Sequence, residues 1–157
     1  MAPITPFPWF GDQAGEAAGF YVSIFPDSRI IETVRYGEGG PGPAGSVMTV
    51  RFELNGTELA ALNGGPAHYG FNLGVSFVIS CESQEDVDHF WSALADGGEE
   101  GQCGWLKDRY GLSWQVAPDG LPALPGDPDP TRAQRAMQAM LTMKKLDIRE
   151  MARAASG

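Results

Sequence analysis

The sequence contains few basic residues, few histidines and few cysteines. Its 11 lysines and arginines stand against 20 aspartates and glutamates, which gives a formal net charge of −9. A chain of this charge repels phosphate backbones and anionic lipid headgroups, so we expect neither nucleic-acid binding nor attachment to a membrane surface. The two cysteines, Cys81 and Cys103, are too few for a disulfide framework and are interpreted as reduced thiols.

Long apolar runs are also absent. No stretch approaches the roughly 18 residues of a membrane span, and the first residues lack both the basic region and the apolar core of a signal peptide. We therefore expect a cytoplasmic protein. Its 157 residues, of which 43% are hydrophobic, suit one domain with a proper core.

The first half of the chain predicts the order β-α-β-β-β. A run interrupted by prolines, 4–10, is typical of an edge strand, and Asp12 is expected to cap the following helix. Apolar residues at helical spacing form one face of that helix: Ala17, Phe20, Tyr21 and Ile24. Pro26 then ends it. Strands are expected at 29–36, 46–54 and 57–62, with a tight hairpin at Asn55-Gly56.

The second half repeats this order. A strand at 75–81 precedes a helix that Ser83 caps, with Asp86 as the capping-box acid. The helix carries an apolar stripe of Val87, Phe90, Trp91 and Leu94, and Gly97-Gly98 ends it. Short strands follow at 99–104, 105–107 and 112–117. The repetition implies two matched modules, 3–65 and 74–118, within a single domain of residues 1–120.

Residues 121–157 are expected to form a linker and a helical tail. "PALPGDPDP" is typical of a proline-rich linker, and a helix is predicted at 131–144. Asp147 and Glu150 form a plausible capping box for a last short helix. Methionines on the first of these helices favour core packing or a subunit contact.

Several stretches carry a resemblance to a known family. They are "ITPFPWFGDQAGEAAGFYVSIFPDS" at the start, "ALNGGP" at 61–66, "VSFVISC" at 75–81, "GGEEGQCGWLKDRYGLSWQV" at 97–116 and "AMLTMKKLDI" in the tail. The chain resembles the PhnB-like branch of the vicinal-oxygen-chelate (glyoxalase/dioxygenase) superfamily, a branch labelled 3-demethylubiquinone-9 3-methyltransferase. The resemblance implies an α+β fold. Its two β-α-β-β-β modules form a curved, mostly antiparallel sheet, usually within a homodimer, and here C-terminal helices are added.

The resemblance also tells where a metal site would lie. The superfamily's enzymes hold a divalent metal ion on the concave face with His or carboxylate ligands. The matching positions fall near Thr5 or Pro6, within 60–63, on Ser76 and on Gln115. None of these is a His or a carboxylate, and Glu58 lies too early in its strand. We therefore expect neither a metal nor a cofactor.

The residues do not support the methyltransferase label. Gly37, Gly39 and Gly42 spell G-x-G-x-x-G, but that signature requires a helix directly after it. Two prolines and the strand at 46–54 follow instead. The run is therefore interpreted as a flexible hairpin loop.

Because the resemblance implies that Ser76 and Gln115 face the concave side, strand alternation predicts a moderately polar, uncharged concave face. Ser76, Ser80, Ser113 and Gln115 are expected to face it, with Asn63 nearby. Small neutral hydrogen-bonding groups in a partly apolar cleft suit a small organic ligand and do not suit acid–base catalysis. The candidate ligand-binding residues are Asn63, Ser76, Cys103, Trp105, Ser113 and Gln115.

Three hypotheses follow. The first is a metal-independent homodimer that binds an unidentified small molecule. The second is an enzyme, with a metal at a shifted position or with Cys103 as a nucleophile activated by His68. The third is an accessory protein whose tail binds a partner. In the last hairpin, Asp108 to Gly111 is interpreted as a solvated turn, and Lys107 or Arg109 is a candidate for holding an anionic ligand.

Overall fold

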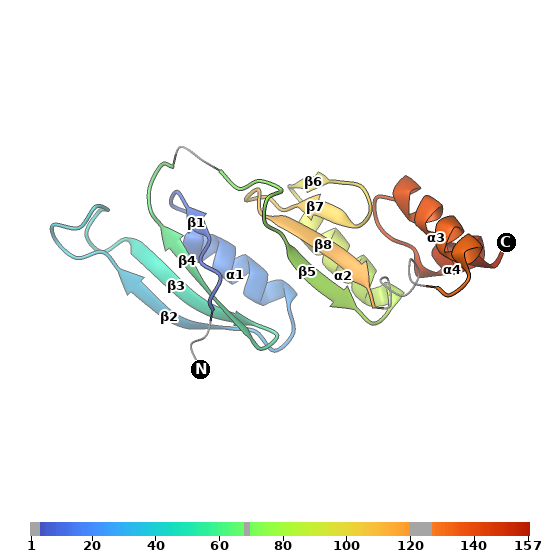
Figure 1. The fold of residues 1–157 in the computed structure, drawn as a ribbon. Helices are drawn as coiled ribbons and strands as arrows, with labels where there is room; N and C mark the ends of the chain where they lie inside the picture. The colour runs from blue at the N-terminus through green and yellow to red at the C-terminus, as the bar shows by residue number, and fades with distance from the viewer. Residues whose placement is uncertain (1–3, 68–69, 120–126) are drawn as a thin grey trace. The chain divides into compact units, whose positions relative to one another are not determined.

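The computed structural model describes residues 4–67, 70–119 and 127–157, and the chain forms two compact units, Met1–Tyr69 and Gly70–Gly157. The first unit contains β1 (Trp9–Phe10), α1 (Ala14–Ile24), β2 (Arg29–Arg35), β3 (Val47–Leu54) and β4 (Thr57–Asn63) (Figure 1). The second contains β5 (Phe77–Cys81), α2 (Gln84–Ala95), β6 (Glu99–Glu100), β7 (Trp105–Lys107), β8 (Ser113–Pro118), α3 (Pro130–Thr142) and α4 (Ile148–Ser156). Each unit thus has the expected β-α-β-β-β order.

The first unit has a four-stranded sheet in the order β1-β4-β3-β2. Only β1 and β4 run parallel, so the sheet is mostly antiparallel, as expected. Proline lacks an N–H but keeps its carbonyl, and Pro6 and Pro8 accept bonds from the N–H groups of Ala60 and Leu62, both at 3.0 Å. The expected edge strand is therefore present, although its regular part is short.

Helix α1 packs on one face of this sheet. Its side chains Ala17, Tyr21 and Ile24 are buried, and the ring of Tyr21 stacks on that of Phe52 at a centroid distance of 6.2 Å. The expectation that Asp12 caps the helix is wrong. The N-cap is Gln13, which makes no side-chain cap bond, and the Oδ1 atom of Asn63 accepts the N–H of Ala14 at 2.7 Å.

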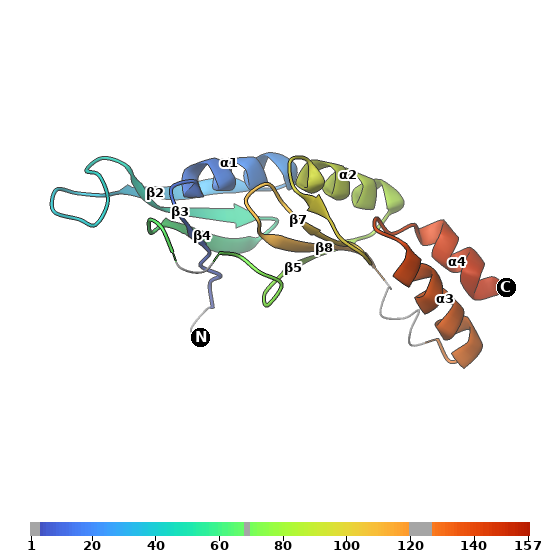
Figure 2. The same ribbon diagram turned by 90° about the horizontal axis from the view of Figure 1, so that it is seen from above.

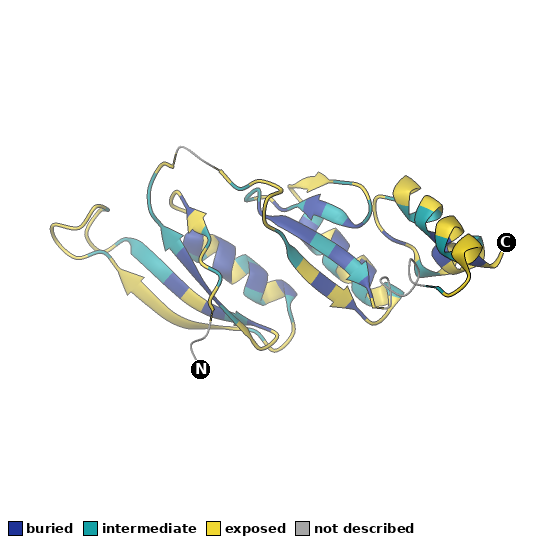
Figure 3. Cartoon of the chain, in the orientation of Figure 1, coloured by how far each residue is buried: buried dark blue, intermediate teal, exposed yellow. Residues whose placement is uncertain are grey.

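The hairpin and loop expectations of the first unit are confirmed. Asn55 and Gly56 have φ values of 44° and 83° between β3 and β4, as the tight Asn-Gly turn requires. The G-x-G-x-x-G run lies in the loop between the antiparallel strands β2 and β3, with no helix after it. Strand β2 is exposed along its whole length (Figure 3).

The second unit has a sheet in the order β5-β8-β7-β6, again with one parallel pair, β5 and β8. Helix α2 lies on one face of it (Figure 2). The capping box of Ser83 and Asp86 is present, and Val87, Trp91 and Leu94 are buried, as the apolar stripe predicts. The strand expected at 99–104 is limited to β6, because Cys103 and Gly104 both have positive φ (58° and 81°) and turn the chain there.

The tail helices belong to the second unit. Asp129 caps α3, and Asp147 caps α4 by accepting the N–H of Glu150 at 2.9 Å, which is one of the two bonds of the expected capping box. The expected linker falls largely on residues 120–126, which lie outside the described residues. No helix in the described part of the chain is long and apolar enough to cross a membrane.

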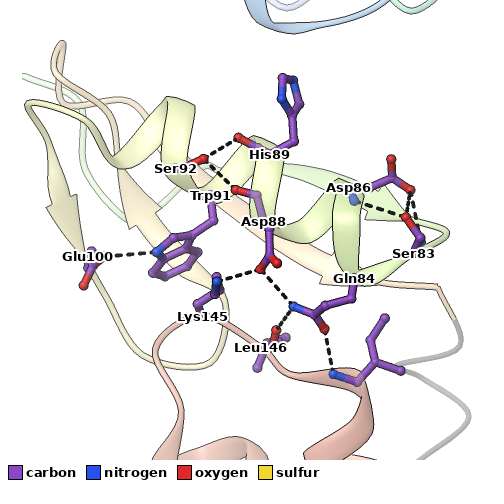
Figure 4. Close-up of polar contacts among 11 residues, drawn as sticks. Ser83, Gln84, Asp86, Asp88, His89, Trp91, Ser92, Glu100, Lys145 and Leu146 are labelled. Atoms are coloured by element: carbon purple, nitrogen blue, oxygen red, sulfur yellow. Dashed lines mark hydrogen bonds and ion pairs between the residues drawn. The ribbon is translucent and has the colours of Figure 1, made fainter.

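The segment between α3 and α4 is bonded to the module. The carbonyls of Met143 and Lys144 accept the N–H groups of Cys103 and Gly104, each at 2.8 Å. Gln84 of α2 accepts the N–H of Ile148 at 2.9 Å and donates to the carbonyl of Leu146 at 3.1 Å. Figure 4 shows these two hydrogen bonds of Gln84 and the ion pair between Lys145 and Asp88, whose charged atoms lie 2.6 Å apart.

Candidate functional site

The sheet face of the second unit that points away from α2 carries several of the predicted residues. Gln115 of β8 is in register with Val78 of β5 and with Trp105 of β7, so the three side chains share one face. The neighbouring residues Trp114 and Val116 are buried on the α2 side, where the ring of Trp114 lies 5.4 Å from that of Phe77. We call the face with Val78, Trp105 and Gln115 the open face.

Ser76 and Gln115 are brought together on the open face. The Nε2 atom of Gln115 donates to the Oγ of Ser76 at 2.9 Å. These are two of the positions at which the superfamily's enzymes would place metal ligands. A hydroxyl and an amide that bond each other are neutral and poor ligands for a divalent ion.

The carboxylate nearest to the ligand position at 60–63 does not supply a metal site either. Glu58, at the start of β4, is held by Arg51, whose Nη2 atom lies 2.8 Å from its Oε1. Within the described ranges no group of three or more His, Cys, Asp or Glu side chains could hold a metal ion. The described residues therefore do not fit the superfamily's metal.

A cavity of about 320 Å³ lies beside Trp105. It is lined by Leu73, Glu99, Glu100, Gly101, Gln102, Trp105, Leu106 and Lys107. Its volume is at the lower end of the range for small-molecule sites. The charged groups of Lys107 and Glu99 pair at 3.3 Å, so the described lining of the cavity holds no uncompensated cation for an anionic ligand.

Ser113 is covered. It shares a face with Lys107 by register, but its side chain is fully buried and its hydroxyl donates to the carbonyl of Asn72 at 3.4 Å. Its contact supports the loop before β5. Strand alternation gave its face correctly and gave no sign of the loop that covers it.

Cys103 contacts the tail. Its Sγ donates to the carbonyl of Met140 at 3.6 Å, and its backbone N–H is bonded to Met143. The structure therefore places it against the end of α3, while Ser76, Gln115 and Trp105 lie on the open face. His68, its hypothetical partner, lies outside the described residues.

The thiol of the other cysteine, Cys81, is unreactive. Cys81 is 1% exposed, and burial raises the pKa of its thiol to about 11, with Asp86 and Asp119 adding to the effect. It is protonated at neutral pH, and a thiol in that state is a poor nucleophile.

Asn63 has a structural role within the first unit. Its Oδ1 caps α1, its Nδ2 donates to the carbonyl of Val47 at 3.1 Å, and its own carbonyl accepts the hydroxyl of Tyr36 at 2.5 Å. Both ends of the side chain are thus bonded to the protein. A ligand would have to compete with these bonds.

A row of charges on the first unit's sheet was not predicted from the sequence. Arg51, between the buried residues Val50 and Phe52, points away from α1 and bonds Glu58 at 2.9 Å and Glu32 at 3.2 Å. The bonds to Glu58 and then Glu32 raise the pKa of the Arg51 guanidinium. The expected uncharged surface therefore does not extend over this sheet. Its signal in the sequence is the charged residue between two apolar ones on β3.

The interpretation of 108–111 as a solvated turn is wrong for Asp108. This residue is 2% exposed, and its carboxylate accepts the indole N–H of Trp114 at 2.8 Å and the N–H groups of Tyr110 at 2.8 Å and Leu112 at 3.1 Å. Gly111 has the expected positive φ, 85°. Arg109 pairs with Asp96 at the end of α2, at 2.5 Å.

Comparisons with known proteins agree with this fold. The family described as 3-demethylubiquinone-9 3-methyltransferase matches residues 2–117. The structure of the PhnB protein from Bacillus cereus shares 34% identity over 74% of this chain and 99% of that chain, with a TM-score of 0.70. A search of curated proteins finds no similar sequence.

Two more distant structures share the fold. Protein PA1353 from Pseudomonas aeruginosa is 22% identical over 75% of this chain and 98% of its own, with a TM-score of 0.64. The fosfomycin resistance protein FosX from Listeria monocytogenes is 14% identical over 78% of this chain and 94% of its own, with a TM-score of 0.57.

Proposed function

The chain belongs to the 3-demethylubiquinone-9 3-methyltransferase family, in its PhnB-like branch with the vicinal-oxygen-chelate fold. From this premise we propose that it is a cytoplasmic homodimer that binds a small organic molecule without a metal ion. The proposed site is the open face of the second unit with the adjoining cavity. The proposal includes no methyl transfer, because the glycine-rich run lies in a strand-to-strand loop.

The bond between Ser76 and Gln115 is the observation that carries this proposal. It fixes the Gln115 amide on the open face, where its oxygen and second N–H point to a ligand that both donates and accepts hydrogen bonds. Trp105 on one side and Val78, 59% exposed, on the other supply apolar surface. A neutral, flat molecule with an amide or similar group suits these neighbours.

The proposal of a homodimer is supported by apolar side chains at the surface. Those exposed to solvent in the single chain are Ile4, Phe7, Trp9, Ile30, Ile31, Val34, Leu73, Val75, Val78 and Leu141. Ile30, Ile31 and Val34 all lie on the exposed strand β2, and apolar side chains gathered on one surface are typical of protein contacts.

Benzamide is a suitable neutral probe for the open face. In a protein NMR titration we expect saturable shifts of the Trp105 indole N–H and the Gln115 side-chain amide. The substitution Gln115→Leu removes the amide, and one or two lost hydrogen bonds should weaken binding by about three- to tenfold.

Gln138→Leu is the matched control, because Gln138 is exposed on α3. We expect it to bind benzamide like the wild type. Equal affinity of the Gln115 variant, or shifts that map to other residues, would contradict the proposed site. Absence of any saturable shift would favour the accessory-protein hypothesis.

A further inference from the structure

A second cavity, of about 640 Å³, lies within the first unit. Its walls come from the turn before α1, the residue after β2, the following loop, the start of β3 and the end of β4: Gly11, Asp12, Tyr36, Pro41, Gly42, Pro43, Ser46, Val47, Asn63, Gly64, Gly65 and Pro66. It therefore joins the G-x-G-x-x-G loop to the "NGGP" stretch, two motifs that the proposed ligand site does not use.

Aromatic rings explain two of the glycines in these walls. A side chain at Gly42 would collide with the ring of Tyr36, and one at Gly64 would collide with the ring of Trp9. The Trp9 indole N–H also donates to the carbonyl of Gly65 at 3.0 Å. The backbone can approach the rings this closely only where no Cβ intervenes, so the shape of the cavity depends on glycine at positions 42 and 64.

The hydroxyl groups that line the cavity donate their hydrogens to backbone carbonyls. The Tyr36 hydroxyl donates to the carbonyl of Asn63 at 2.5 Å, and the Ser46 hydroxyl donates to the carbonyl of Pro43 at 2.6 Å. With these bonds in place, each hydroxyl oxygen can still accept a hydrogen bond but has no hydrogen to donate.

The charge carried by the described lining residues is negative. Asp12 supplies a carboxylate, which only accepts, and the described residues of the lining include no Lys, Arg or His. Around these oxygens the walls are apolar, formed by the prolines, Val47 and the Tyr36 ring. The cavity thus offers three acceptors, Asp12, Tyr36 and Ser46, in a partly apolar recess.

We propose that this cavity binds a small primary amine in its ammonium form, with an apolar body. An ammonium group carries three donors and no acceptor, which complements Asp12 and the oxygens of Tyr36 and Ser46. The apolar body packs against the prolines and the Tyr36 ring, whose face also attracts a cation. The net charge of −9 favours the approach of cations over anions.

Three probes that share one ring and differ in their polar group test this inference: cyclohexylamine, cyclohexanol and cyclohexanecarboxylate. In NMR titrations of the full chain at pH 7, cyclohexylamine should give saturable shifts at the backbone amides of Gly11, Gly64 and Gly65. We expect cyclohexanol to bind at least about tenfold more weakly and the carboxylate not to bind. Equal binding of the alcohol or the carboxylate, or amine shifts outside the cavity, would overturn the inference.

A pair of variants separates the carboxylate in the cavity from general surface charge. Asp12→Asn should weaken cyclohexylamine binding by about tenfold, the effect of a charge-assisted hydrogen bond. Glu38→Gln removes the same charge from an exposed residue of the loop between β2 and β3 that is not among the lining residues, and it should change affinity by less than about twofold. The inference fails if both variants bind like the wild type or if both lose affinity equally.

Discussion

Replacing Asp108 by alanine is expected to lower the free energy of unfolding of the second unit by about 3 kcal/mol or more. The substitution removes the acceptor of three N–H groups: the indole of Trp114 and the backbone amides of Tyr110 and Leu112. Each donor that loses its acceptor in a buried place costs about 1–3 kcal/mol. Urea denaturation followed by tryptophan fluorescence measures the change.

Asp96→Ala is the matched control for this prediction. Asp96 is also an aspartate with a side-chain partner, here the cationic Arg109, but its side chain is 76% exposed. Exposed ion pairs contribute about 1 kcal/mol or less, so this variant should stay close to the wild type. A decrease in the free energy of unfolding of under 1 kcal/mol for Asp108→Ala would show that the carboxylate does not stabilise the last hairpin through its three hydrogen bonds.

Leu146→Ala is expected to release the tail from the module at a cost of about 2–4 kcal/mol. Leu146 is fully buried between α3 and α4, and a side chain at Gly104 would lie within 3.0 Å of its Cδ1 atom, so the space around it is filled. Hydrogen exchange reads out the docking directly. The N–H groups of Cys103 and Gly104, bonded to the tail carbonyls at 2.8 Å, should lose protection in the variant.

Leu141→Ala serves as its control, because Leu141 is a leucine of the same tail that is 58% exposed. Its truncation should change stability by about 0.5 kcal/mol or less and leave both amides protected. Unchanged protection in Leu146→Ala would mean that Gln84 and the ion pair of Lys145 with Asp88 hold the tail without the leucine. The tail follows the segment that the family match covers, residues 2–117.

Local patterns were sufficient to predict most of the fold. The apolar stripes of α1 and α2, the Ser83–Asp86 capping box and the Asn55-Gly56 turn each depend on neighbours a few positions away, and all are present. The Asp12 cap failed because Asn63, 49 positions away, takes the first amide of α1. Asp108 was misjudged for a similar reason, since its burial depends on the fold around Trp114.

The site was predictable where it depends on the family's ligand positions and on strand alternation around them. The family resemblance placed Gln115 and Ser76 on the same face, alternation extended that face to Ser113, and the bond between Gln115 and Ser76 shows that these two meet. It could not reveal that the loop at Asn72 covers Ser113 or that the tail occupies the surroundings of Cys103, because both contacts join segments distant in sequence.

The account depends most on the claim that neutral groups at Ser76 and Gln115 replace the metal ligands of the superfamily. The most direct test is the metal content of the untagged protein after incubation with Mn²⁺, Fe²⁺, Ni²⁺ or Zn²⁺ and removal of loosely bound ions. Because a hydroxyl and an amide bonded to each other at 2.9 Å are poor ligands, we predict less than about 0.1 ion per chain. About one tightly bound ion per chain would contradict the claim and favour a metal-dependent enzyme.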